Sequence, residues 1–326
     1  MSHLKLALAG VLCLGLGGLA LAQPPQAPGG RGTTSLAQPK DAPPAKPTPP
    51  GPYAVTVEAN AGLMTHTIYR PTDLKRFSGG KRLPIIAWGN GACSNAGRLF
   101  EGFLSQVASH GFLIIASGPK DAPLPTFAAV VPPGAVKAKA GDPPQPMTKD
   151  IDMQTALDWA IRQNGDKASP YFGRLNPDKI AVMGQSCGGL QAIANAGDPR
   201  VKTVVVWNSG AFPESGAAAT RSMSGASKAS LAKFHTPVAY INGGPSDVAY
   251  VNSVDDVSRI KGVPVFHGWI NVGHGGTYND PGAGWFGEVG VAWLEWRLNG
   301  DKKAARMFEG KDCTLCTNPI WHVENN

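Results

Sequence analysis

Short continuous apolar runs recur along the chain between Gly-rich or polar segments. A run of roughly four to eight apolar residues bounded by turn residues is typical of a strand that is covered on both faces. The pattern predicts six such strands. They span residues 83–88, 112–116, 180–183, 201–207, 236–242 and 263–271.

Segments with the period of a helix lie between several of these runs. Apolar residues recur at helical spacing between residues 97 and 110, and Gly111 follows as a C-cap. A second helix is predicted from Thr148, with Ile151 on its buried face, and a final amphipathic helix over residues 284–298. Strands that alternate with helices form parallel sheets, so we predict an α/β fold with a mostly parallel central sheet and helices on both faces.

Two segments before the first buried run have a different pattern. Residues 53–57 and 64–69 alternate apolar with polar positions, which is typical of half-exposed antiparallel strands at the edge of a sheet. His66 falls in this alternation, and we interpret it as an exposed strand residue rather than a ligand. The domain is therefore expected to begin with an antiparallel edge.

The chain before Tyr53 is predicted to lie outside the folded domain. Residues 1–22 contain one Lys and an apolar run that ends in Ala20-Leu-Ala22, which is typical of a cleavable export signal. Residues 23–52 are rich in Pro and poor in large apolar side chains, so they are predicted to form a flexible linker. One domain over residues 53–326 follows, and the protein is expected to be secreted or periplasmic.

The formal net charge of +7 changes little in this picture. Lys5, Arg31, Lys40 and Lys46 less Asp41 contribute +3 of it before the domain, which leaves +4. That charge is small and scattered, and no Lys/Arg run is interleaved with aromatic residues, so no nucleic acid partner is expected. We expect a monomer with no stable membrane insertion after the signal is cleaved.

The sequence Gly184-Gln-Ser-Cys-Gly188 lies between a buried run and a helix of small residues. This is the Gly-x-Ser-x-Gly arrangement of a nucleophile elbow, in which a tight turn exposes the serine hydroxyl at the edge of a parallel sheet. The amide that follows the serine points to the place where an oxyanion would form. Ser186 is therefore the candidate nucleophile, and Cys187 is a candidate oxyanion donor.

Two further side chains complete a candidate triad. Asp247 follows the strand predicted at 236–242, and His274 lies between glycines in the loop after the last predicted strand. The chain order nucleophile, acid, base is the order found in α/β-hydrolases. In the loop after the first buried strand, Asn90 and then Gly91 are the candidates for a second oxyanion amide.

Several motifs together resemble one family. They are Leu83-Pro-Ile-Ile-Ala-Trp-Gly-Asn-Gly91, Val107-Ala-Ser-His-Gly-Phe112, Gly184-Gln-Ser-Cys-Gly-Gly189, Asn242-Gly-Gly-Pro-Ser-Asp-Val-Ala-Tyr250 and Gly273-His-Gly275. Over residues 83–298 the chain resembles the secreted bacterial α/β-hydrolases of the cutinase and polyester-hydrolase type and their dienelactone-hydrolase-like relatives. The resemblance implies the α/β-hydrolase fold. It also implies hydrolysis of a small or polymeric carboxylic ester by Ser186, Asp247 and His274, without a cofactor or a metal.

Four cysteines follow the predicted signal, and an even number in an exported protein favours two disulfides, with three connectivities. Cys187 follows the nucleophile and Cys93 lies three residues past Asn90. We hypothesise that a Cys93–Cys187 bridge fixes the two oxyanion loops relative to each other. Cys313 and Cys316 would then form a second disulfide in the tail, with a redox pair or half of a zinc site as alternatives.

Other functions of the same motifs stay open. The triad does not distinguish water from an amine or an alcohol, so a peptidase or an acyltransferase is an alternative, and so is a noncatalytic binding module with the same cleft. Trp88, Phe127, Trp207 and Tyr250 lie near predicted loop mouths and are candidates for a pocket that binds a ring. The Pro-rich segment at 117–147 is a candidate lid or substrate wall.

Overall fold

A computed structural model of the chain describes residues 38–125, 147–214 and 223–325. The predicted export signal, residues 23–37 of the predicted linker, Phe127 and most of the candidate lid lie outside the described residues. Within these ranges, no helix is both long enough and apolar enough to cross a bilayer.

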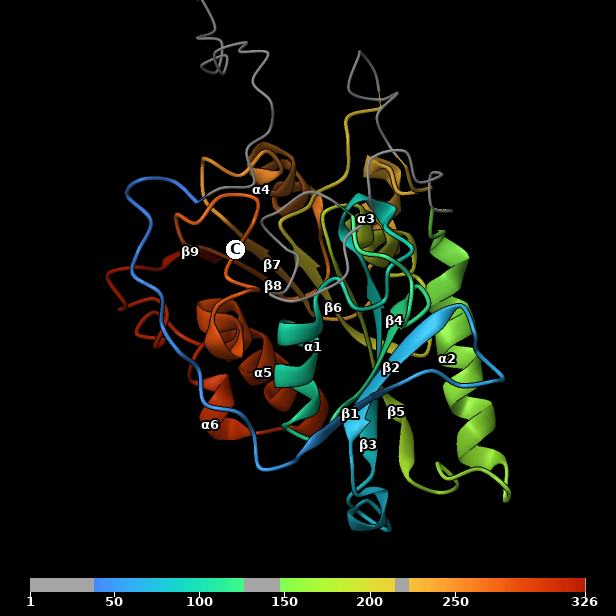
Figure 1. The fold of residues 1–326 in the computed structure, drawn as a ribbon. Helices are drawn as coiled ribbons and strands as arrows, with labels where there is room; N and C mark the ends of the chain where they lie inside the picture. Colours follow the sequence, from blue (N-terminus) through green and yellow to red (C-terminus); the bar gives the residue numbers. More distant parts are fainter. Residues whose placement is uncertain (1–37, 126–146, 215–222, 326) are drawn as a thin grey trace, which may run out of the picture. The chain divides into compact units, whose positions relative to one another are not determined.

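The described residues form one nine-stranded sheet in the order β1-β2-β4-β3-β5-β6-β7-β8-β9 (Figure 1). The strands are β1 (Val55–Glu58), β2 (His66–Pro71), β3 (Leu83–Gly89), β4 (Leu113–Ser117), β5 (Leu175–Gln185), β6 (Val201–Trp207), β7 (Val238–Asn242), β8 (Val265–Trp269) and β9 (His322–Asn325). The strands from β4 to β8 in this order pair in parallel, whereas β1, β2 and β9 pair antiparallel with their neighbours. The predicted α/β class with a mostly parallel sheet and an antiparallel edge is confirmed.

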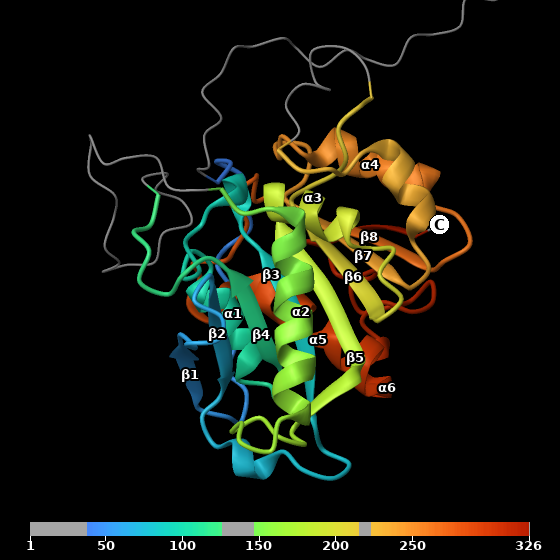
Figure 2. The same cartoon turned by 90° about the vertical axis from the view of Figure 1, so that its right-hand side faces the viewer.

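Helices cover both faces of this sheet (Figures 1 and 2). They are α1 (Glu101–Ala108), α2 (Asp150–Gly165), α3 (Cys187–Ala194), α4 (Tyr250–Arg259), α5 (Gly284–Asn299) and α6 (Lys302–Ala305). Side chains alternate between the two layers along each strand. Ile86 packs with the apolar residues of α1 and α5, whereas the neighbouring Ile85 packs with those of α2 and α3.

The chain after α6 folds back along the sheet, which the sequence did not indicate. β9 pairs antiparallel with β8, and His322 lies opposite Trp269. Trp321, one residue earlier, is buried, and Phe308 packs against Trp293 of α5. The expectation that the segment at 263–271 holds the last strand is therefore wrong. With only four residues, this edge strand is too short to be recognised from its pattern of apolar and polar positions.

Three predictions of which side chains are buried or exposed, each based on periodicity, are also wrong. Ile151, placed on the buried face of α2, is 54% exposed. Helix α5 is more deeply buried than an amphipathic surface helix, because ten of its sixteen residues are buried, and Glu288 and Glu295 are only partly exposed. His66 is fully buried, because its ring lies against the first turn of α2 and contacts the backbone of Asp152 there.

His66 is held as a neutral imidazole. Its Nε2 lies 2.9 Å from the backbone oxygen of Asp152 and its Nδ1 lies 2.9 Å from Thr65 Oγ1, so Nε2 carries the proton and Nδ1 accepts. Burial lowers the pKa of His66, and the contact with Asp152 opposes only part of that effect. The unfolded chain therefore binds a proton more readily than the folded chain does.

This difference predicts a loss of stability in mild acid. A histidine with a lowered folded pKa contributes its full stability above the unfolded pKa of about 6.5, and the contribution falls as the pH drops through that value. We expect a lower urea midpoint at pH 5.5 than at pH 7.5. His66→Gln should reduce this pH dependence, and an unchanged pH dependence in that variant would contradict the assignment.

Residues 38–52 lie against the domain from Gln38 onwards (blue in Figure 1). Gln38 Nε2 donates to the Gly276 oxygen at 3.3 Å, and Thr48 Oγ1 donates to the Gly284 oxygen at 2.8 Å. Lys46 lies 4.5 Å above the ring of Trp285. Contacts with the domain thus begin upstream of Tyr53, where the linker was expected to end.

Candidate active site

Ser186 lies in the sharp turn between β5 and α3. Its backbone has φ 54° and ψ −116°, a conformation that is costly for a residue with a Cβ atom. The Ser186 amide donates to the Trp207 oxygen at 2.9 Å, and Ser209 Oγ donates to the Ser186 oxygen at 2.6 Å. A Cβ atom at Gly188 would collide with the Gly89 carbonyl, so this glycine allows α3 to approach β3. The local geometry is that of a nucleophile elbow.

His274 joins the serine to the acid. His274 Nε2 lies 2.9 Å from Ser186 Oγ, and His274 Nδ1 lies 2.7 Å from Asp247 Oδ1. Gln185, the residue before the serine, donates its side-chain amide to the His274 oxygen at 3.1 Å and so holds the base loop against the elbow. The structure therefore brings together the three side chains that the sequence placed in separate loops.

Asp247 is buried, and all of its partners favour the charged carboxylate. Oδ1 accepts from His274 and from the Ala249 amide at 2.9 Å, and Oδ2 accepts from the Gly243 amide at 3.1 Å. Burial by itself raises the pKa of the Asp247 carboxyl, but the hydrogen bond and charge of His274 and the two amides together hold that pKa below its ordinary value. The acid is thus ready to stabilise an imidazolium.

Asn208, which the sequence did not single out, links the acid loop to the base loop. It follows β6 with φ 42°, and its Nδ2 donates to Asp247 Oδ2 at 2.8 Å and to the Gly273 oxygen at 3.2 Å. Its Oδ1 accepts from the hydroxyl of Tyr278 at 2.6 Å. Both Asn208 and Tyr278 are buried, so neither is placed to contact a substrate. Asn208 thus fixes the carboxylate of Asp247 relative to the loop that carries His274.

Asn208→Ala is expected to lower kcat for an ester substrate by roughly 10- to 100-fold with little change in KM, because the acid and base lose their fixed positions. Tyr278→Phe, which removes only the hydroxyl, should show a smaller fall of the same kind. Steady-state kinetics with both variants measure this, alongside their melting temperatures. A lower melting temperature with unchanged kcat would indicate a purely structural role.

The loop after β3 is joined covalently to the start of α3. Cys93 and Cys187 form a disulfide with their Cα atoms 5.2 Å apart, and the predicted pairing is confirmed. Within this loop Ala92 and Cys93 have φ values of 53° and 48°, which gives a tight turn. The bridge places Gly91 and the loop amides close to the first turn of α3, which begins at Cys187.

The side chain of Asn90 has a structural role. It is buried, its Oδ1 accepts from Trp88 Nε1 at 2.9 Å, and its Nδ2 donates to the backbone oxygens of Ser94, Ala96 and Ser117. These contacts shape the loop and leave the side chain no group for an oxyanion. The backbone amide of Asn90 stays a candidate oxyanion donor, together with the amides of Gly91 and Cys187.

The structure does not place the predicted ring-binding residues in one pocket. Trp88 and Trp207 are fully buried and pack against Phe103, which excludes direct contact with a ligand at the surface. Tyr250 is partly exposed, but it starts α4 and contacts Trp269. The two tryptophans are buried because their side chains point to the face of the sheet that α1 and α5 cover.

Cys313 and Cys316 form the second disulfide, with their Cα atoms 4.9 Å apart. Their sulfurs are therefore not available as zinc ligands. In the described ranges, no group of three or more His, Cys, Asp or Glu side chains is arranged to hold a metal ion.

Comparison with known proteins adds no relative: no protein-family model matches the chain, and no curated protein matches it.

Proposed function

We propose that the protein is an exported serine esterase that hydrolyses carboxylic esters through an acyl-enzyme. One observation carries the proposal: His274 lies within hydrogen-bond distance of both Ser186 Oγ and Asp247 Oδ1, next to a strained elbow. An imidazole in this position can activate a serine hydroxyl, which is otherwise a weak nucleophile. The motif resemblance to cutinase-type hydrolases favours an ester, and the export signal predicted at 1–22 favours action outside the cytoplasm.

In the acylation half-reaction, Ser186 Oγ attacks the carbonyl carbon and its proton passes to His274 Nε2. The carbonyl electron pair moves to the oxygen, and the backbone amides of Cys187 and the loop after β3 stabilise the resulting oxyanion. The bond to the alcohol oxygen then breaks. His274 donates its proton to that oxygen, so that a neutral alcohol leaves.

In the deacylation half-reaction, water attacks the acyl-enzyme and gives a proton to His274 Nε2. The second tetrahedral intermediate collapses, Ser186 Oγ leaves, and it takes this proton back. Asp247 accepts the hydrogen bond from His274 Nδ1 throughout and stabilises the imidazolium. The products are an alcohol and a carboxylic acid, and the serine is regenerated.

Hydrolysis of p-nitrophenyl acetate and butyrate, combined with labelling by a fluorophosphonate, tests the proposal. We expect turnover of at least one ester and one phosphonyl group attached to Ser186, located by peptide mass mapping. Cleavage of amides alone would favour the peptidase alternative, and ester formation with added alcohol in preference to hydrolysis would favour an acyltransferase. Absence of both turnover and label in the folded protein would overturn the proposal and favour a noncatalytic module.

A further inference from the structure

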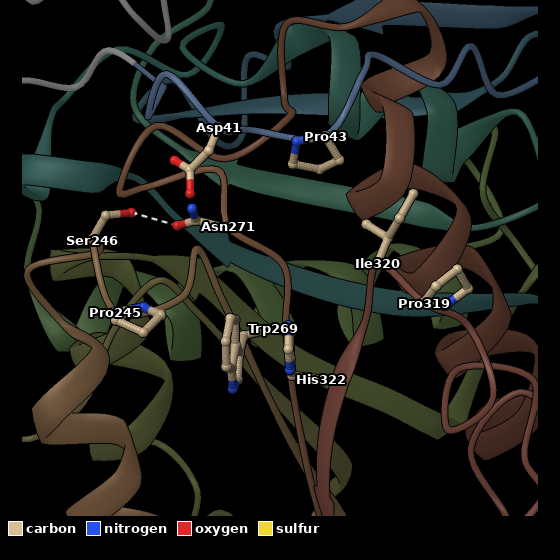
Figure 3. A pocket seen from close by; sticks show the side chains of 9 residues that line it. All are labelled: Asp41, Pro43, Pro245, Ser246, Trp269, Asn271, Pro319, Ile320 and His322. Atoms are coloured by element: carbon tan, nitrogen blue, oxygen red, sulfur yellow. Dashed lines mark hydrogen bonds between the residues drawn. The ribbon is translucent and has the colours of Figure 1, made fainter.

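A surface pocket of about 670 Å³ lies beside the acid and base loops (Figure 3). Its lining includes Ser246, which precedes Asp247, and Asn271, which lies three residues before His274. Ser246 Oγ donates to Asn271 Oδ1 at 3.0 Å, so this pair joins the two loops. Ser186 is not among the described residues that line the pocket. The pocket is therefore separate from the candidate nucleophile.

One side of the pocket offers hydrogen-bonding groups. Asn271 uses its oxygen for Ser246, and Asp41 adds a carboxylate to the lining (Figure 3). The lining thus contains both an amide donor and a carboxylate acceptor. Hydroxyl groups both donate and accept, so two neighbouring hydroxyls of one ligand satisfy such a pair.

The remaining lining is largely apolar. Pro43, Pro319 and Ile320 supply aliphatic surface from the N-terminal and C-terminal segments. Below them, the rings of Trp269 and His322 are stacked with their centroids 3.8 Å apart and their planes 10° apart. These two residues are cross-strand partners on β8 and β9, so the stack is fixed by the sheet. A ligand here needs C–H surface on one side and hydroxyl groups on the other.

The charges restrict the ligand further. Asp41 contributes a carboxylate, and no Lys or Arg is present among the described lining residues. An anionic ligand would meet a like charge without a fixed cation to offset it. A plain acyl chain would leave the amide of Asn271 and the carboxylate without partners. A volume of this size accommodates a ligand of one or two rings.

We propose that this pocket binds a neutral saccharide unit. A pyranose ring combines an apolar C–H surface with a rim of hydroxyls, which matches the two kinds of wall. This assignment does not depend on the reaction proposed for Ser186, since none of its residues belongs to the triad. It provides a second point of attachment, next to the acid loop, for a sugar-bearing molecule.

Calorimetric titration of cellobiose into the full-length Ser186→Ala protein tests this assignment without the complication of turnover. We expect saturable binding with a Kd in the millimolar range. Asn271→Ala and Asp41→Ala should each weaken binding roughly fivefold or more, because each removes a hydrogen-bonding partner. Asp178→Ala, which removes an exposed carboxylate of β5 outside the pocket, serves as the matched control and should not change Kd.

A second comparison tests the charge argument. Methyl β-glucoside should bind at least about fivefold more tightly than methyl β-glucuronide. Asp41→Asn should narrow this difference. The assignment is overturned by an absence of saturation up to about 50 mM cellobiose, by unchanged affinity in both pocket variants, or by equal binding of the uronide. None of these outcomes bears on ester hydrolysis by Ser186.

Discussion

Ser186→Ala is expected to lower kcat for p-nitrophenyl butyrate by about 10⁵- to 10⁶-fold. The variant keeps His274 and Asp247 but has no hydroxyl to form the acyl-enzyme, so the reaction loses its covalent route. Among the described residues, the Ser186 hydroxyl is hydrogen-bonded to His274 alone, and the melting temperature should therefore change little. Rates measured with excess enzyme over substrate, with a fluorophosphonate-inactivated sample as background, resolve the difference.

His274→Ala provides the control for this result. Its kcat should fall by a similar factor. The double variant Ser186→Ala/His274→Ala should have a kcat no lower than that of either single variant, because the triad acts as a unit. A Ser186→Ala protein that retained more than about a tenth of the activity would show that the hydrolysis occurs elsewhere. Additive losses in the double variant would show that the two side chains act independently.

Removal of the Cys93–Cys187 disulfide by Cys93→Ala/Cys187→Ala is expected to lower the free energy of unfolding by about 4.7 kcal/mol. The two cysteines are 94 residues apart in sequence, so the bridge restricts a large part of the unfolded chain. The loss also frees the loop after β3 from the start of α3, and kcat should fall along with stability. Urea unfolding monitored by tryptophan fluorescence measures the change.

The second disulfide offers a matched comparison. Cys313 and Cys316 are three residues apart, so the same chain-entropy argument predicts a cost of only about 1.6 kcal/mol for Cys313→Ala/Cys316→Ala. Cys93, Cys187 and Cys313 are buried and Cys316 is partly buried, so alanine removes side-chain contacts in both double variants. An equal fall in the free energy of unfolding of the two double variants would show that local packing, rather than chain closure, determines how much each disulfide stabilises the protein.

Much of the candidate site was accessible from the sequence because its signals are local. The elbow around Ser186 is a five-residue motif, and Asp247 and His274 each lie five residues past the end of a strand with an apolar run. The carboxyl ends of parallel strands meet at one edge of a sheet, so side chains in successive loops can be expected to meet. The cysteine pairing followed from the same reasoning, because each partner is a short distance in sequence from one oxyanion loop.

The supporting residues around the triad were not accessible in this way. Asn208 lies 39 residues before Asp247 and 65 residues before Gly273, and nothing near it in sequence shows that its side chain contacts both. Trp88 and Trp207 illustrate the opposite error. A strand end next to a functional loop can face the solvent or a helix, and only the packing of α1 and α5 decides that both tryptophans are buried.

Alone, the sequence determined the α/β class, the central strands and the order of the candidate triad. Each of these depends on periodicity or on motifs within about ten residues, which backbone geometry translates directly into local structure. Only the tertiary structure decided that His66 is buried, that β9 completes the sheet, that residues 38–52 lie along the domain, and that a separate pocket forms beside the acid loop. These features arise where segments that are distant in the chain bury each other's surface. The stabilisation comes from contacts between the segments, so the sequence of one segment alone does not predict it.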